Sequence, residues 1–160
     1  MAVIADYMVE KLGATLVFLP NCTAKGDDDR DALEEIGRRM CHNDRVLFVK
    51  EDISLEENLE IMSSLDFFLG TRLHSNILAA VMCVPLLPLV GTCSPRLPGI
   101  MKMLGMYPYI CNIMTEDENI ILGKLSEVWE SRLHIKEILK SSCARARSAA
   151  MENTALILEL

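Results

Sequence analysis

The amino-acid sequence predicts an α/β fold, doubly wound around a mostly parallel sheet of about five strands. Short apolar runs alternate with segments of helical periodicity along the whole chain. These runs lack the alternation of a half-exposed strand, so we expect helices to cover both faces of the sheet. Polar residues gather where the runs end, which is the edge at which open parallel sheets bind ligands.

The first elements follow from apolar spacing and from residues that stop helices. Val3, Ile4, Met8 and Leu12 recur at helical intervals, and Gly13 is expected to end that helix. An acidic stretch later in this half is suited to the positive end of a helix dipole. The expected elements are a helix over 1–12, a strand over 14–20, a helix from 27 to about 40 and a strand over 45–49.

Two capping boxes mark helix starts in the remainder of the chain. One runs from Ser54 to Glu57 and the other from Thr115 to Glu118, and each has the spacing that satisfies free backbone donors reciprocally. The expected elements are helices over 54–63, 73–82, 98–105, from 115 past Trp129, and over 132–157, with strands over 65–70, 84–90 and 107–111.

Composition limits the classes of function. The 160 residues are 51% hydrophobic and 24% charged, which is typical of one folded domain spanning 1–160. The net charge of −7 and the lack of a basic cluster argue against nucleic-acid binding. The sequence shows no apolar run of transmembrane length and no secretory signal, so we expect a cytoplasmic protein. The chain opens on a helix rather than on a strand, which suggests that an N-terminal domain is missing from it.

The six cysteines are expected to be reduced and free of metal. They form no paired C-x-x-C spacing, and several lie in apolar stretches where a thiol packs as a small hydrophobe. Cys41 and His42 are adjacent, but two ligands do not make a zinc site. We therefore expect neither a metal nor a cofactor.

The best candidate site lies between residues 70 and 75, at the junction of an expected strand and helix. Free N–H groups and the dipole at a helix N-terminus favour an anion. Arg72 adds a fork of donors that suits a carboxylate or a phosphate. The helix dipole disfavours the cationic form of His74, and a bound anion would reverse this, so His74 is a candidate general acid.

Structural interpretations of the same residues stay open at this point. Arg72 can instead pair with an acid, and His74 can serve as a helix cap. Glu51 and Asp52 fit a solvated turn, and Arg96 fits an exposed loop.

The run LDFFLGTRLHSNILAAVMCVPLLPL resembles a motif of the polysaccharide pyruvyltransferase family. That motif is a strand ending in Asp-x-x-(Ile/Leu)-Gly, followed by x-Arg-Leu-His, a helix of small residues and a Val-Pro strand. The segment Ser94–Gly99, followed by Leu104-Gly105, is similar to the family's Asp-Pro-Lys-x-x-Gly…Leu-Gly loop. It carries Ser94 and Arg96 where the family has Asp and Lys. FLPN and the DDDRDALEEI helix are similar to the family's middle section.

The resemblance implies a two-domain enzyme of the GT-B type, in which this chain is the C-terminal, Rossmann-like domain. The donor would be phosphoenolpyruvate, and the product would be a pyruvyl ketal on a sugar or glycan acceptor. Arg72 would hold the donor's anionic groups, and His74 would protonate its methylene carbon. The other substrate-binding residues implied are Leu73, Ser75, Ser94 and Arg96. The isolated chain is expected to be inactive, because the site of such enzymes lies between two domains.

Two other functions remain as alternatives. The first is the nucleotide-sugar-binding half of a GT-B glycosyltransferase, in which Glu51, Asp52 or Glu116 would bind the ribose hydroxyls. The second is a non-catalytic module that binds an anion or a sugar.

Overall fold

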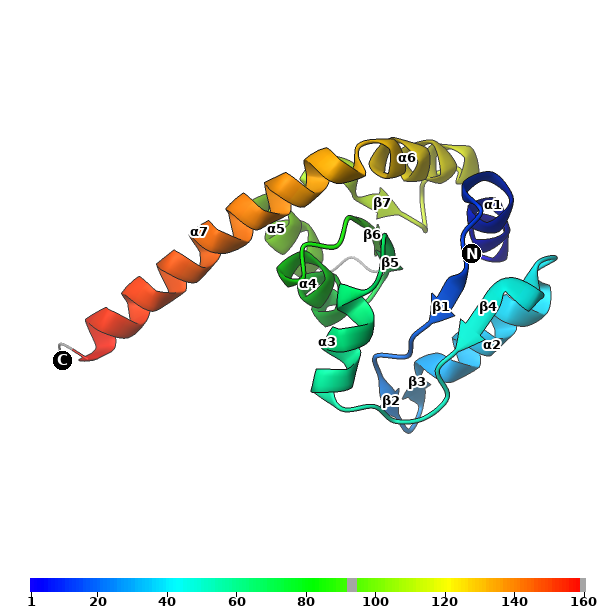
Figure 1. Cartoon of the computed structure of the whole chain (residues 1–160), viewed down its shortest axis with the longest axis horizontal. Helices are drawn as coiled ribbons and strands as arrows, with labels where there is room; N and C mark the ends of the chain where they lie inside the picture. The colour runs from blue at the N-terminus through cyan, green and yellow to red at the C-terminus, as the bar shows by residue number, and fades with distance from the viewer. Residues whose placement is uncertain (92–94, 159–160) are drawn as a thin grey trace. The chain divides into compact units, whose positions relative to one another are not determined.

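The structure is a computed structural model that describes residues 1–91 and 95–158, with side chains as far as residue 152. The chain forms two compact units, Met1–Ser54 and Leu55–Leu160 (Figure 1). Each unit is built from strands connected by helices. The organisation of 1–160 as a single domain stays a prediction.

The N-terminal unit contains a parallel pair of strands. β1 (Leu16–Phe18) pairs with β4 (Val46–Phe48) along their whole lengths. Its core joins Ala5, Leu16, Phe18 and Met40. The other elements are α1 (Ala2–Leu12), the hairpin strands β2 (Thr23–Ala24) and β3 (Asp27–Asp28), α2 (Asp29–Arg39) and the 3₁₀ turn η1 (Asn43–Arg45).

Gly13 ends α1 as predicted. Its backbone lies in the left-handed region at φ 65°, and its N–H group donates to the carbonyl of Val9 at 3.1 Å. Only glycine adopts this conformation without the cost of a Cβ clash. The predicted position of this helix end is therefore confirmed.

The start of α2 differs from the prediction by two residues. Asp27 and Asp28 form strand β3 of a tight antiparallel hairpin instead of the first helical turn. Asp28 then acts as the N-cap, because its carboxylate accepts from the N–H of Arg30 at 2.9 Å. Hydrogen bonds from the Arg30 side chain and backbone lower the pKa of Asp28. The acidic run marks the start of a helix, as predicted, but Asp28 precedes the first helical residue and caps it.

The C-terminal unit contains a three-stranded parallel sheet in the order β5-β6-β7. β5 (Phe68–Gly70) lies beside β6 (Leu86–Val90), which in turn lies beside β7 (Cys111–Asn112). The helical elements are α3 (Leu55–Ser63), α4 (Leu73–Val81), α5 (Arg96–Met103), the 3₁₀ turn η2 (Tyr107–Tyr109), α6 (Glu118–Glu130) and α7 (Arg132–Leu158).

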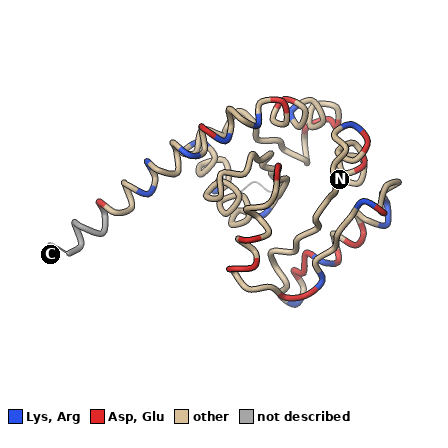
Figure 2. Tube along the Cα trace, viewed as in Figure 1, with Lys and Arg blue, Asp and Glu red and all other residues tan. Residues whose placement is uncertain are grey.

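Strand β6 is the centre of this sheet and is buried at every residue. Alternate residues of a strand face opposite sides, so complete burial requires cover on both faces. The helices α4, α5 and α6 all pack against β6 and provide that cover. The residues of β6 carry no charge, whereas Figure 2 shows acidic and basic residues together along α2, which has no buried residue.

The α/β fold class is confirmed. Helices alternate with parallel strands, and the described residues form no closed barrel, as expected of a Rossmann-like fold. The predicted parallel strands occur as a pair in the N-terminal unit and as a triplet in the C-terminal unit. Within residues 1–91 and 95–158, no helix combines the length and apolar character needed to cross a bilayer.

Two local predictions in the C-terminal unit were wrong. Residues 107–109 form a 3₁₀ turn with Pro108 in its first positions, where the missing N–H group costs no hydrogen bond, and the strand begins at Cys111. Helix α6 begins at Glu118, and its N-cap is Asp117 rather than Thr115. The Asp117 carboxylate accepts from the N–H of Asn119 at 2.8 Å, a geometry that competes with the predicted capping box.

Five cysteines, all except Cys93, lie in the described part of the chain and are free thiols. Cys111 is buried, and this burial raises its pKa to about 11, against an opposing effect of Lys124. The backbone N–H of Cys41 donates to Asp6 at 3.0 Å, so the Cys41–His42 pair lies beside α1. Whether all six thiols stay reduced and metal-free in solution remains a prediction.

The end of α4 carries an unusual residue for its conformation. The N–H groups of Cys83 and Val84 donate to Ala80 and Ala79, each at 2.9 Å, which is the Schellman pattern. Cys83 occupies the position that glycine usually takes and has φ 57°.

We expect Cys83→Gly to raise the free energy of unfolding by about 0.5–1 kcal/mol, because relief of left-handed strain exceeds the added entropy of the unfolded chain. Urea denaturation of the variant and of wild type measures this difference. Cys83→Ala is the control, since it removes the thiol and keeps the Cβ atom. Equal stability of the Gly and Ala variants would contradict the interpretation.

Candidate functional site

The candidate site is the turn from Gly70 to Ser75, where β5 ends and α4 begins. Gly70 is the last residue of β5, and Arg72 is the N-cap of α4 with extended backbone angles, φ −74° and ψ 132°. Phe68 folds its ring over Gly70, and a Cβ atom at Gly70 would lie 2.6 Å from that ring. Only glycine allows the chain to leave the strand at this point without moving the ring.

Helix α4 supplies free backbone donors to this turn. Its first backbone bond within the helical ladder runs from the N–H of Asn76 to the carbonyl of Arg72 at 3.2 Å. The N–H groups of Leu73, His74 and Ser75 precede that bond and have no acceptor within the helix. The N-terminus of α4 therefore combines unsatisfied donors with the positive end of the helix dipole.

Ser75 and Asn76 bring buried polar atoms to the same helix end. Ser75 is 2% exposed and Asn76 is fully buried. Neither Ser75 Oγ nor Asn76 Oδ1 has a hydrogen-bond partner among the described residues. Buried polar atoms are rarely left without a hydrogen-bond partner, so this helix end is a candidate place for a ligand to supply one.

Arg72 and His74 differ in their surroundings. Arg72 is half-buried, whereas His74 is exposed at the second position of α4. No described residue forms a hydrogen bond or an ion pair with the His74 side chain that would hold it as a helix cap. His74 is therefore accessible to a reactant at the helix N-terminus.

The topology brings a second predicted segment to the same edge of the sheet. β5 and β6 are parallel neighbours, with Gly70 opposite Pro88, so their carboxyl ends lie side by side. Gly91 follows β6, and Arg96 is the exposed first residue of α5. Leu73, at the start of α4, belongs to the same edge. Ser94 lies outside the described residues.

The carboxylates considered for a nucleotide sugar are engaged elsewhere or lie in solvent. Asp52 is exposed and pairs with Arg30 at 3.4 Å, within the N-terminal unit. Glu116 pairs with Lys124 at 3.3 Å in the C-terminal unit, while Lys124 also donates to the carbonyl of Ile110 at 2.7 Å. Glu51 is an exposed turn residue.

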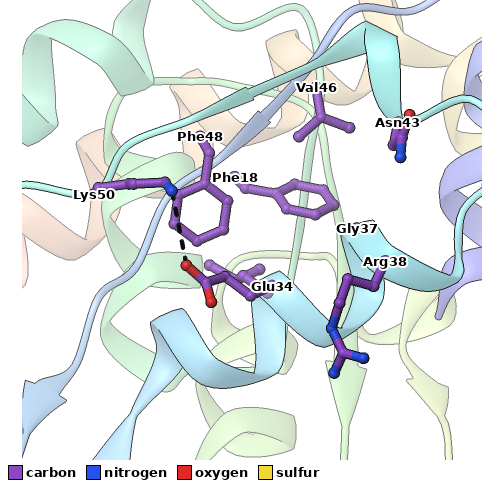
Figure 3. Close-up of a pocket in the computed structure, with 9 residues that line it drawn as sticks. Phe18, Glu34, Gly37, Arg38, Asn43, Val46, Phe48 and Lys50 are labelled. Carbon is purple, nitrogen blue, oxygen red and sulfur yellow. Dashed lines mark ion pairs between the residues drawn. The ribbon is translucent and has the colours of Figure 1, made fainter.

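A separate pocket of about 440 Å³ opens within the N-terminal unit (Figure 3). The rings of Phe18 and Phe48 form an edge-on pair in its wall, with centroids 6.2 Å apart. Lys50 lies 5.6 Å from the centre of the Phe48 ring and 3.9 Å from Glu34. None of the residues predicted for the anion site lines this pocket.

Asn76 was not among the site residues predicted from sequence. Its side-chain nitrogen donates to the carbonyl of Gly70 at 3.0 Å and to the carbonyl of Arg72 at 2.7 Å. The available signal was a lone amide in an otherwise small and apolar helical run, four residues after Arg72. That signal indicates burial of a polar group, but only the folded turn identifies its partners.

Comparison with known protein families gives a match that covers the candidate turn. A family model described as polysaccharide pyruvyl transferase matches residues 1–91. The match includes the whole N-terminal unit and continues through β5, α4 and β6. It contains the turn from Gly70 to Ser75 and ends before Arg96. No curated protein and no solved structure matches the chain.

Proposed function

Because the chain belongs to the polysaccharide pyruvyl transferase family, we propose that the turn from Gly70 to Ser75 binds phosphoenolpyruvate as the pyruvyl donor. The family indicates transfer of a pyruvyl group to a polysaccharide. The donor carries a phosphate and a carboxylate on one three-carbon unit, so its recognition requires a concentrated set of anion-binding groups.

The observation that carries this proposal is the half-buried Arg72 at a helix N-terminus with free donors. A guanidinium fork and backbone N–H groups bind oxyanions without a metal. Ser75 adds a buried hydroxyl with no partner among the described residues, as expected of a group that a ligand satisfies. Arg96, at the start of α5, provides a second cation, and Ser94 is proposed as a further contact.

The proposed reaction uses His74 as a general acid. Protonated His74 donates its proton to the donor's methylene carbon, which becomes a methyl group and leaves an oxocarbenium-like centre at C2. One hydroxyl group of the acceptor sugar adds to C2 and returns its proton to His74. The C2–O bond to phosphate then breaks, and phosphate leaves with the bonding electron pair. The second hydroxyl group adds to the C2 centre so formed, and its proton goes to the departing phosphate. The product is a pyruvyl ketal, and Arg72 and the α4 donors stabilise the anionic charge throughout.

The exposure of His74 favours this role over helix capping. A general acid must reach the reacting carbon, and a buried or internally bonded imidazole would not. The acceptor sugar is proposed to contact a second, N-terminal domain of GT-B type, as the resemblance implies. We also propose that the enzyme is cytoplasmic.

We expect the 160-residue chain to bind phosphoenolpyruvate at least about tenfold more tightly than uridine diphosphate, because the proposed site offers closely spaced donors for a compact, highly charged anion. Isothermal titration of both ligands into the chain measures the ratio. Pyruvate is the control, since it carries the carboxylate without the phosphate. Tight binding of the nucleotide without binding of phosphoenolpyruvate would instead favour a nucleotide-sugar enzyme that uses Glu51, Asp52 or Glu116.

A further inference from the structure

We propose that Asn76 is a positioning residue, which holds the Gly70–Arg72 turn in its anion-binding shape through an amide bridge. This bridge consists of the two hydrogen bonds from Asn76 Nδ2 to the carbonyls of Gly70 and Arg72, at 3.0 and 2.7 Å. The bridge joins the last residue of β5 to the N-cap of α4. Its contribution to donor binding rests on the function proposed above.

The chemistry of its partners determines the orientation of the Asn76 amide. Both partners are carbonyl oxygens, so only the NH₂ group can face them. Each hydrogen of that group therefore meets one carbonyl, and the donor capacity of the side chain is fully used. The Oδ1 atom points elsewhere and has no hydrogen-bond partner among the described residues.

Burial makes the bridge effective and also costly. Asn76 is fully inaccessible to solvent, so water does not compete for its two amide hydrogens. The unsatisfied Oδ1 atom opposes folding, and an apolar residue of the same size would avoid that cost. Core packing therefore does not explain an asparagine at this position, whereas the bridge to the turn does.

The bridge acts on the residues that the proposed site uses. The Arg72 carbonyl accepts from Asn76 twice, through the backbone N–H at 3.2 Å and through Nδ2 at 2.7 Å. These two hydrogen bonds to one carbonyl restrain the peptide that leads into Leu73, and so orient the first free N–H groups of α4. The Gly70 carbonyl is held by the same amide, which restrains the turn at its other end.

The test compares wild type with Asn76→Leu, which keeps the number and branching of the side-chain heavy atoms and removes the bridge. The first readout is hydrogen exchange at the backbone amide of residue 76, which reports opening of the first turn of α4. We expect exchange there to become at least about tenfold faster in the variant. The second readout is calorimetric titration with phosphoenolpyruvate, whose affinity we expect to fall about tenfold while the melting temperature changes little.

Helix α6 provides the matched controls. The N–H of Ile121 donates to the carbonyl of the N-cap Asp117 at 3.2 Å, the same distance as the Asn76–Arg72 backbone bond, and Ile121 is also buried. Its exchange should not change in Asn76→Leu. The variant Asn119→Leu, at the start of α6, should change neither donor affinity nor exchange at residue 76.

The outcomes separate this proposal from the proposed function. Unchanged exchange at residue 76 together with unchanged donor affinity in Asn76→Leu would overturn the bridge. Failure of wild type to bind phosphoenolpyruvate would overturn the proposed function, and the exchange readout alone would then decide the bridge. If Asn76→Leu does not fold, hydrogen exchange in wild type still tests the bridge. The bridge requires slower exchange at residue 76 than at residue 121, and the reverse order contradicts it.

Discussion

Replacement of His74 by alanine is expected to lower the turnover of pyruvyl transfer by about a hundredfold or more, the usual effect of losing a general acid. Binding of phosphoenolpyruvate should change little, because Arg72 and the backbone donors of α4 remain in place. The loss should therefore appear in kcat and not in the dissociation constant of the donor. Phosphate release and calorimetry measure the two quantities separately.

The assay for His74→Ala uses the form of the protein that turns over, either this chain alone or the chain joined to the N-terminal domain that the resemblance implies. His134→Ala is the matched control, because His134 is an exposed histidine on α7. Its turnover should equal that of wild type. Full activity of His74→Ala would exclude His74 as the proton donor to the methylene carbon.

Replacement of Arg72 by alanine is expected to weaken phosphoenolpyruvate binding by about 1.5–3 kcal/mol, which is the range for a hydrogen bond to a charged group. This corresponds to a roughly 10- to 150-fold increase in the dissociation constant. Arg72→Lys should recover part of the affinity, since lysine keeps the charge and loses the two-pronged geometry. Calorimetric titration of both variants measures these changes.

The control for Arg72 is Arg147→Ala, which removes an exposed guanidinium from α7. It should leave the affinity for phosphoenolpyruvate unchanged at moderate ionic strength. A loss of affinity equal to that of Arg72→Ala would indicate general electrostatic attraction to the chain. An unchanged affinity in Arg72→Ala would place the donor away from the turn between Gly70 and Ser75.

Local chemistry explains which parts of the fold were predictable. The end of α1 at Gly13 depends on one residue that adopts a left-handed conformation without strain, so it can be predicted from neighbours in sequence. The strand β6 was predictable because it consists of consecutive apolar residues bounded by turn signals. The start of α6 was placed near the correct residue, but the choice between Thr115 and Asp117 as cap depends on backbone geometry.

The candidate site divides in the same way. Arg72 and His74 were identified from sequence, because the junction of an apolar strand and a helix can be located by composition alone. The carboxyl ends of β5 and β6 lie side by side, as expected of neighbouring parallel strands. Asn76 was missed, because its partners are backbone carbonyls, which every residue carries and no sequence pattern distinguishes.

The sequence by itself determined the α/β class, the order of the main helices and parallel strands, and the strand–helix junction that we propose as an anion site. These features depend on side-chain polarity and on its periodicity along the chain. Only the tertiary structure decided that Ser75 and Asn76 are buried, that His74 is exposed and that the Asn76 amide bridges Gly70 and Arg72. Burial depends on packing by segments distant in sequence. A hydrogen bond depends on donor–acceptor distances that are set to within a few tenths of an ångström. Neither property can therefore be predicted from local residue order.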